Sequence, residues 1–387
     1  MKIAIVCTEK LPVPPVRGGA IQLYIDGILP YLSTRHYITV FCIADASLPD
    51  RELTSNPRFI RVDSRDYLEN VKKELSGRYF DLIHVFNRPK WIMELSSTAP
   101  DSKFMLNLHN EMFKPKKIPV LEARKCIQRV EKIVTISDFI GRGVTALYPE
   151  AAPKITTVYS AADIDRIRPV WSNSALTSLR SAMKEKLGIQ DKRVVLYVGR
   201  LSEKKGTHIL LQAMQEIVSR YPDVILLVVG SKWYGKNEVD DYVSLLHRQA
   251  ATLGSKVVFT GFISPQDIDK YYACGDLAVI TSQWEEPLSR VHYEVMAAGL
   301  PIITTNRGGN AEVVAGQGTG IVIDDFNNPA AFSRAISYLL SHPDEARLMG
   351  AKARALAERK FHWERVGKDI LRLYAEIENG SFPRWEV

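Results

Sequence analysis

The stretch Arg193-Val194-Val195-Leu196-Tyr197-Val198-Gly199-Arg200 decides the fold. Its apolar run has no polar face, which is typical of a strand covered on both sides, as in a parallel sheet. A glycine, a charged segment and then a helix follow the run. This order predicts one strand-helix step of an α/β domain, with a loop at the carboxyl end of the strand.

Similar runs alternate with amphipathic helices along the whole chain. One such helix spans Ile21–Leu32, with Pro30 near its end. The predicted strands are Lys2–Cys7, Tyr37–Ile43, Arg58–Val62, Asp81–Phe86, Phe104–His109, Lys132–Ser137 and Ile155–Tyr159 in the first half, and Arg193–Gly199, Asp223–Gly230, Lys256–Thr260, Asp276–Thr281, Pro301–Thr305 and Gly320–Ile323 in the second. We therefore expect two doubly wound, Rossmann-like α/β domains facing a central cleft, with ligands at the carboxyl ends of the strands. The first comprises residues 1–168 and a C-terminal helix at about 368–387, and the second residues 169–367.

Composition excludes several classes of protein. Of 387 residues, 46% are hydrophobic and 25% charged, the balance of an ordinary globular protein rather than a disordered or fibrous one. No window approaches the roughly 18 uninterrupted apolar residues of a membrane-spanning helix. The N-terminal run lacks the form of a signal peptide, and the four cysteines lack disulfide or metal-ligand spacing. We expect a cytoplasmic protein, with the inner membrane face as a further location.

The turn Arg17-Gly18-Gly19-Ala20 precedes the first predicted helix. Adjacent glycines allow a backbone to approach a ligand closely, and the helix N-terminus behind them favours an anion. A plain flexible turn is the alternative. The GxGxxG fingerprint of a dinucleotide-binding domain does not follow the first strand, which argues against a dehydrogenase.

A second signal, Gly199-Arg200-Leu201-Ser202-Glu203-Lys204-Lys205-Gly206, lies at the functional edge of the second predicted sheet. Arg200 and Lys205 could hold a diphosphate through charge-assisted hydrogen bonds. A solvated charge run before a helix is the alternative.

The third signal joins two carboxylates to a helix start. Glu286 precedes a helix that runs to Ala298, and Glu294 lies within it. Ser289 is predicted as the N-cap, so that the backbone N–H groups of Leu288, Ser289 and Arg290 are available to an anion. Carboxylates accept hydrogen bonds only and suit sugar hydroxyls; an exposed helix with capping acids is the alternative.

These residues, with Gly308-Gly309-Asn310-Ala311-Glu312 downstream, resemble the retaining glycosyltransferases of family 4, which have the two-domain GT-B fold. The Glu286-x7-Glu294 spacing carries the resemblance, which extends over nearly the whole chain and within the family is strongest to bacterial spore-coat and aminoglycoside-pathway enzymes. It implies transfer of a sugar from a nucleotide-sugar, most often a UDP-sugar, to an acceptor hydroxyl with retained anomeric configuration. The sugar expected from the resemblance is glucose or N-acetylglucosamine, and the spore is a further expected location. The implied roles are a diphosphate clamp for Arg200, Lys205 and the N–H groups of Leu288–Arg290; sugar contacts for Glu286 and His109; ribose contacts for Glu294; base contacts for Phe262 and Ile263; and a glycine-rich ligand turn for Gly18 and Gly19.

Two departures from the family pattern concern loops. Ser289 stands where the family usually has glycine, and Ser160-Ala161-Ala162-Asp163 replaces the usual Asn-Gly-Val-Asp. We expect no cofactor and no metal, because no metal-ligand spacing occurs and cations already flank the site. A nucleotide-sugar epimerase, a phosphorylase of the same fold and a non-catalytic coat or assembly protein that binds nucleotide-sugars remain alternatives.

The net charge of +7 suits anionic partners without identifying one. No nucleic-acid recognition motif is present, and we expect no nucleic-acid partner. The segment 114–132 is basic, and contact with an anionic membrane or acceptor is one interpretation of it. A solvated helix face is the other. The basic residues are Lys114, Lys116, Lys117, Arg124, Lys125 and Arg129.

Overall fold

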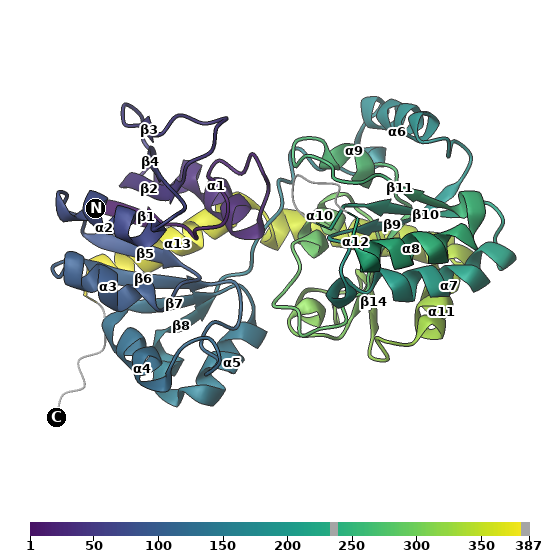
Figure 1. Ribbon diagram of the computed structural model, residues 1–387. Coiled ribbons are helices and arrows are strands. Elements are labelled where there is room, and N and C mark those ends of the chain that lie inside the picture. The colour runs from purple at the N-terminus through teal and green to yellow at the C-terminus, as the bar shows by residue number, and fades with distance from the viewer. Residues whose placement is uncertain (233–238, 381–387) are drawn as a thin grey trace. The chain divides into compact units, whose positions relative to one another are not determined.

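A computed structural model describes residues 1–232 and 239–380. The chain forms two compact units (Figure 1). The first contains residues 1–160 and the C-terminal segment from Trp363, and the second contains Ala161–His362. The boundaries predicted near residues 168 and 367 lie a few residues beyond these. The helix predicted at about 368–387 begins earlier, as α13 (Trp363–Glu378), and residues 381–387 of that prediction lie outside the described residues.

An eight-stranded sheet forms the centre of the first unit, in the order β3-β4-β2-β1-β5-β6-β7-β8. All neighbours pair in parallel except β3 with β4. Apolar residues fill the central strands, as the sequence predicts for strands covered on both faces. The strands are β1 (Lys2–Val6), β2 (Tyr37–Ile43), β3 (Arg51–Glu52), β4 (Arg58–Val62), β5 (Leu82–Phe86), β6 (Lys103–Leu108), β7 (Lys132–Thr135) and β8 (Ile155–Thr157).

Helices cover both faces of this sheet. One face packs against α2 (Tyr67–Ser76), α3 (Trp91–Thr98), α4 (Val120–Arg129) and α5 (Asp138–Leu147) in a single apolar core. The other face packs against α1 (Ala20–Leu32), which has Pro30 within it, and against α13, which contacts α1. A hydrogen bond of 2.8 Å between His84 Nδ1 and the Tyr374 hydroxyl links β5 to α13. The C-terminal helix is therefore part of the first unit (Figure 1).

The second unit contains a six-stranded, wholly parallel sheet in the order β11-β10-β9-β12-β13-β14. Its strands are β9 (Arg193–Val198), β10 (Val224–Val229), β11 (Val257–Phe259), β12 (Leu277–Ile280), β13 (Ile302–Thr305) and β14 (Gly320–Ile323). The α-helices are α6 (Ser174–Lys186), α7 (Thr207–Arg220), α8 (Asp241–Ala251), α9 (Ile268–Tyr272), α10 (Val291–Ala297), α11 (Pro329–Ser341) and α12 (Pro343–Lys360). The second unit also has short 3₁₀ turns, η2 (Val170–Ser172), η3 (Glu203–Lys205), η4 (Gly254–Lys256) and η5 (Asn310–Val313). The first unit has one among the described residues, η1 (Pro149–Lys154).

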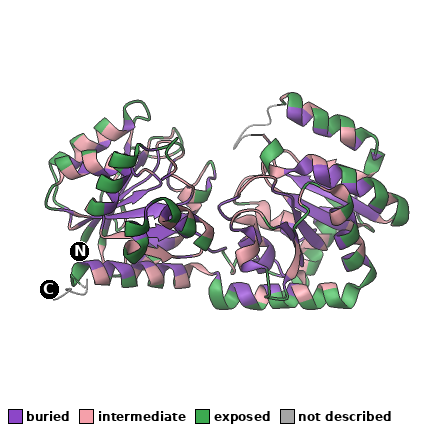
Figure 2. Cartoon of the chain, turned by 90° about the horizontal axis from the view of Figure 1, so that it is seen from below, coloured by how far each residue is buried: buried purple, intermediate pink, exposed green. Residues whose placement is uncertain are grey.

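Each sheet is buried between its helices (Figure 2). Because the strands of the second unit are all parallel, their carboxyl ends meet at one edge, where α/β folds bind ligands. All four cysteines are buried and form no disulfide. Among the described residues, no helix has the length and apolar character needed to cross a bilayer.

Candidate active site at the edge of the second sheet

The loop after β9 fixes Lys205 against the end of β12. The segment turns through η3, and α7 begins two residues after Lys205. The Lys205 carbonyl accepts a hydrogen bond from the Thr281 hydroxyl at 2.7 Å, and the Lys204 carbonyl accepts one from the N–H of Gln283 at 2.8 Å. Two strand ends that are distant in sequence thus hold the lysine backbone in one place.

The side chains of Lys205 and Glu286 form a buried ion pair. Lys205 Nζ lies 2.7 Å from Glu286 Oε2. The same oxygen accepts hydrogen bonds from Trp284 Nε1 at 2.7 Å and from the Ser282 hydroxyl at 3.1 Å. Burial alone would raise the pKa of Glu286, but the charge of Lys205 and these donors outweigh it and lower the pKa. Glu286 is therefore ionised near neutral pH and acts only as an acceptor.

The glycine-rich turn after β13 holds the backbone of Glu286. Gly308 has φ of +60°, and a Cβ built on it would lie 2.0 Å from the Glu286 carbonyl oxygen. That carbonyl accepts a hydrogen bond from the N–H of Gly309 at 2.8 Å. Only glycine permits this approach. The turn therefore fixes the position of the Glu286 backbone.

Glu285, the neighbouring acid, has different partners. It forms an ion pair with Arg307 at 2.8 Å and accepts the N–H of Gly308 at 2.7 Å. Glu286 alone of the two is paired with Lys205, which agrees with the preference for Glu286 that the spacing to Glu294 indicates.

Glu294 lies on α10 with both oxygens engaged. Oε2 accepts a hydrogen bond from the Tyr272 hydroxyl at 2.7 Å, and Oε1 pairs with Arg290 at 3.1 Å. Arg290 also donates to the carbonyl of Ala161 at 3.1 Å. Burial and the adjacent carboxylate raise the pKa of Tyr272 well above its usual value, so the phenol remains a hydrogen-bond donor.

The structure corrects the prediction for Ser289. The helix α10 begins at Val291 with Arg290 at its N-cap, and no side chain caps it. The N–H of Ser289 is not available to an anion, because it donates to Asn310 Oδ1 at 3.2 Å. Tertiary contacts from the turn after β13 therefore replace the local cap.

A buried histidine completes this loop. His292 Nδ1 lies 2.9 Å from the Ser289 carbonyl, and Nε2 lies 2.9 Å from the Thr304 hydroxyl. A carbonyl can only accept, so Nδ1 carries the proton and Nε2 accepts from Thr304. Burial lowers the pKa of His292 to about 4, which keeps the ring neutral.

The other predicted residues of the second unit lie at the same sheet edge. Arg200 follows the end of β9 by two residues, and its carbonyl accepts a hydrogen bond from the Tyr197 hydroxyl at 3.2 Å. Phe262 and Ile263 are half-buried and follow β11, next to a bridge between Gly230 and Gly261. Leu288 is buried in the loop before α10.

The first unit holds the remaining candidates. Gly18 and Gly19 end the loop before α1, and both have positive φ. Gly19 has φ of +102°, a backbone conformation that favours glycine. His109 is buried just after β6. Its backbone N–H donates to Asn87 Oδ1 at 3.1 Å, and its ring contacts Tyr24 edge-on.

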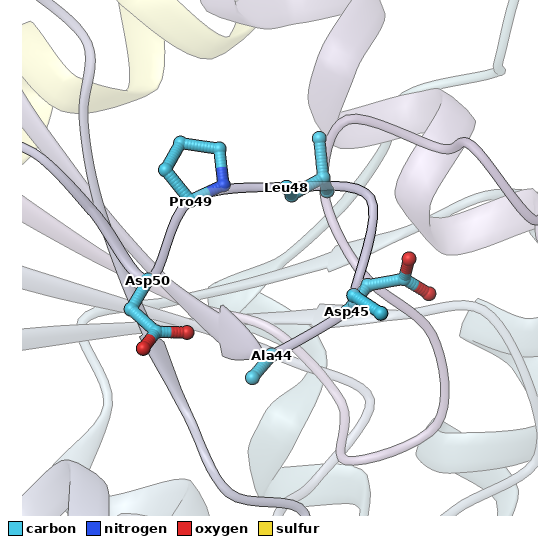
Figure 3. Close-up of a pocket in the computed structure, with 6 residues that line it drawn as sticks. Ala44, Asp45, Leu48, Pro49 and Asp50 are labelled. Carbon is cyan, nitrogen blue, oxygen red and sulfur yellow. The ribbon is translucent and has the colours of Figure 1, made fainter.

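A pocket lies beside that turn, in the loop after β2 (Figure 3). It has a volume of about 500 Å³ and includes Asp45 and Asp50 in its lining. Arg17 pairs with Asp45 at 3.0 Å, and hydrogen bonds from Arg17 and Ser47 hold the pKa of Asp45 well below its usual value. The pocket and the Gly18-Gly19 turn are therefore joined by one ion pair.

Sequence reasoning missed four residues of the site: Ser282, Trp284, Tyr272 and His292. Ser282, Trp284 and Glu286 are spaced by two residues after a strand end, a pattern that would have suggested a shared side. Nothing local marks Tyr272 or His292. Across residues 1–232 and 239–380, no three His, Cys, Asp or Glu side chains are grouped so that they could hold a metal ion.

Comparisons with known proteins agree with this architecture. Residues 180–356 match the family described as "Glycosyl transferases group 1". The Bacillus subtilis protein named "Spore coat protein SA" is 46% identical over 97% of this chain and 99% of its own length. A second B. subtilis protein, "Putative glycosyltransferase YtcC", is 42% identical over 99% of this chain and 95% of its own.

Solved structures show the same fold. The Anabaena protein HepE, crystallised with UDP-glucose, has a TM-score of 0.76 at 22% identity, over 97% of this chain and 100% of its own. The fold is thus GT-B, as predicted. The protein belongs to the group 1 glycosyltransferases.

Proposed function

We propose that this protein is a retaining, family 4 glycosyltransferase that moves glucose or N-acetylglucosamine from a UDP-sugar to an acceptor hydroxyl. The observation that carries the proposal is the buried Lys205–Glu286 pair at the carboxyl edge of the second sheet. It combines a cation suited to phosphate with an acceptor-only group suited to a sugar hydroxyl. The crystal structure of HepE in complex with UDP-glucose supports a UDP-linked donor.

In the reaction, the bond between the sugar C1 and the phosphate oxygen breaks, and UDP leaves with the bonding electrons. The acceptor oxygen forms the new bond to C1, and its proton passes to the departing phosphate oxygen. Arg200 and Lys205 stabilise the charge that develops on the diphosphate, with the N–H groups of Leu288 and Arg290 beside them. Such preorganised donors supply a large part of catalysis in many enzymes.

The remaining candidates bind and orient the donor. Glu286 accepts a hydrogen bond from a hydroxyl of the transferred sugar. Glu294 accepts hydrogen bonds from the ribose hydroxyls through the remaining lone pairs of its oxygens. Phe262 and Ile263 contact the base. We propose that His109 contacts the transferred sugar and that the Gly18-Gly19 turn binds ligand. A separate substitution tests each of these two roles.

The proposal includes no cofactor and no metal. Arg200 and Lys205 provide the positive charge that a divalent cation would otherwise bring to the diphosphate. Transfer rates that are unchanged by EDTA would support this assignment, and loss of activity restored by Mg²⁺ or Mn²⁺ would refute it.

Thermal unfolding with UDP, UDP-glucose, UDP-N-acetylglucosamine and GDP-mannose tests the donor, because a ligand that binds only the folded state raises the melting midpoint. We expect the UDP compounds to stabilise most. Proton NMR of the product then reports the anomeric configuration. Isomerised nucleotide-sugar without transfer would indicate an epimerase, and a strict need for inorganic phosphate would indicate a phosphorylase.

A second candidate function follows from the name of the spore coat relative. A coat or assembly protein that binds nucleotide-sugars without using them would be stabilised by UDP-sugars but would release no UDP over hours with any acceptor. Association of the protein with purified spores, rather than with the cytoplasmic fraction, would support this role.

We also propose that the basic segment 114–132 brings the enzyme to an anionic membrane surface that presents the acceptor. Leu121, at 74% exposure, and Val120, at 45%, lie on α4 beside the exposed Lys116, Lys117 and Lys125. Apolar side chains among cations suit an interface of anionic lipid. Flotation with phosphatidylglycerol vesicles should fall in a Lys116→Glu, Lys117→Glu, Lys125→Glu variant; binding equal to wild type would refute the contact.

A further inference from the structure

Three hydrogen-bond donors converge on one oxygen of Glu286 and leave the other without one. Lys205 Nζ, Trp284 Nε1 and the Ser282 hydroxyl all reach Oε2, at 2.7, 2.7 and 3.1 Å. Within the described ranges 1–232 and 239–380, no donor reaches Oε1. The carboxylate is thus held in one orientation, with one oxygen saturated.

A carboxylate has about four lone-pair sites, or about two on each oxygen. Three donors more than fill Oε2, so a substrate hydroxyl can bind only at Oε1. The glutamate is buried, at 7% exposure. The arrangement therefore presents one directed acceptor atom rather than a rotating carboxylate.

Trp284 and Ser282 keep this orientation independent of Lys205. The indole is itself held, because Lys204 Nζ lies 4.9 Å from the centre of its ring in a cation–π contact. Ser282 follows the end of β12 by two residues and is buried. When a diphosphate competes for the ammonium of Lys205, two neutral donors remain on Oε2.

We propose that Trp284 and Ser282 are positioning residues that fix Oε1 of Glu286 as the acceptor for one hydroxyl of the donor sugar, and so make the enzyme select for that hydroxyl. This inference rests on the proposed transfer from a UDP-sugar. Sites built to hydrogen-bond a hydroxyl discriminate strongly against analogues that lack it. The donor class is therefore a nucleotide-sugar with a free hydroxyl at the position facing Glu286.

The test compares Trp284→Phe, which keeps a ring but removes the N–H, with Ser282→Ala, Ser282→Thr and the control Trp171→Phe. Trp171 is 59% exposed and lies in η2, away from Glu286 in sequence and hydrogen bonding. Loss of a hydrogen bond to a charged group predicts a fall in kcat/KM of about tenfold or more for Trp284→Phe and Ser282→Ala. Ser282→Thr should restore most of it, and Trp171→Phe should match wild type.

A readout specific to orientation uses a set of monodeoxy UDP-glucose donors. In wild type, one deoxy donor should be rejected far more strongly than the others. In Trp284→Phe that rejection should shrink by at least about fivefold, because a carboxylate with fewer donors selects less sharply. An unchanged rejection in both Trp284→Phe and Ser282→Ala would overturn the inference.

A measurement without turnover separates this inference from the proposed function. The indole N–H resonance of Trp284 is identified in ¹⁵N-labelled protein by its loss in Trp284→Phe. It should move upfield in Glu286→Gln, which weakens the hydrogen bond, whereas the resonance of Trp171 should not. If the wild type uses no UDP-sugar, the proposed function fails; if the Trp284 resonance does not respond to Glu286→Gln, the positioning role fails.

Discussion

Lys205 and Glu286 lie 2.7 Å apart with side-chain exposures of only 17% and 9%. They are far apart in sequence and meet because β9 and β12 are neighbours in the sheet. A charge buried to this degree is stable only when it is paired and hydrogen-bonded. The pair therefore holds together the loops that follow β9 and β12, and these loops carry candidate catalytic residues.

Removing either member of the pair should reduce activity strongly. We expect Lys205→Ala and Glu286→Ala each to lower turnover at least about tenfold, because both act on the charge or the sugar in the transition state. Circular dichroism should show intact folds. Turnover near wild type in both variants would show that the site is wrongly assigned.

The same pair should influence stability. Lys205→Ala leaves a buried carboxylate without its cation and should cost about 3 kcal/mol or more in the free energy of unfolding. The double variant Lys205→Met, Glu286→Gln removes both charges and should recover most of this loss. Urea unfolding of wild type, Lys205→Met, Glu286→Gln and the double variant measures the coupling between the two side chains; simple additivity of the two single changes would contradict it.

Glu286 predicts how that stability depends on pH. Its pKa in the folded protein is below the unfolded value of about 4.3. Its stabilising effect is therefore complete above that value and is lost as pH falls through the folded pKa. In Lys205→Ala the lysine charge no longer offsets the effect of burial on Glu286, so the pKa of Glu286 in the folded protein rises. The stability difference between wild type and variant should thus be larger at pH 7 than at pH 4; a constant difference would be inconsistent with the ion pair.

His292 predicts a second effect of acid. Burial lowers its pKa to about 4, so between about 6.5 and 4 the unfolded chain binds a proton that the folded protein does not. Stability should fall as pH decreases through this window, by up to about 3 kcal/mol from this group. His292→Gln should flatten the dependence. An unaltered slope in the variant would mean that the ring is not held neutral.

Gly308 offers a steric test with a matched control. Gly308→Ala places a methyl group 2.0 Å from the Glu286 carbonyl oxygen, whereas Gly316 has a similar φ of +69° and open space around its Cβ position. Both changes strain the backbone, but only the first displaces Glu286. We expect turnover to fall at least about tenfold in Gly308→Ala and to stay near wild type in Gly316→Ala. Equal activities of the two variants would show that the turn after β13 does not position Glu286.

Glu294 should affect nucleotide affinity. If its carboxylate holds the ribose hydroxyls, Glu294→Ala should weaken UDP binding about tenfold or more. Wild type should also prefer UDP over 2′-deoxy-UDP, and the variant should lose that preference. Calorimetric titration gives both affinities; a preserved preference would assign the ribose to another residue.

Strands were the most predictable part of the fold. The predicted bounds of β2 and β4 coincide with the structure: His36 precedes the apolar run of β2, and Pro57 and Asp63 flank β4. The strand β3 was missed, since Arg51 and Glu52 form a short, polar edge pair without an apolar run. The hydrophobic pattern of a sequence identifies buried strands, and a short edge strand such as β3 buries few residues.

The site was predictable only in its outline. Strand ends in a parallel sheet meet at one edge, which brings Lys205 toward Glu286 from sequence alone. The backbone of Ser289 was wrongly assigned, because Asn310 and His292 fix it through contacts that local propensity does not contain. The same holds for Tyr272, whose hydrogen bond to Glu294 joins α9 to α10, two helices that lie apart in the sequence.

A crystal structure with bound UDP-glucose tests the central claim most directly. We predict that the diphosphate lies within hydrogen-bond distance of Lys205 and Arg200, with a sugar hydroxyl on Oε1 of Glu286. A nucleotide-sugar bound elsewhere, with the Lys205–Glu286 pair undisturbed and no contact to Glu294, would contradict it.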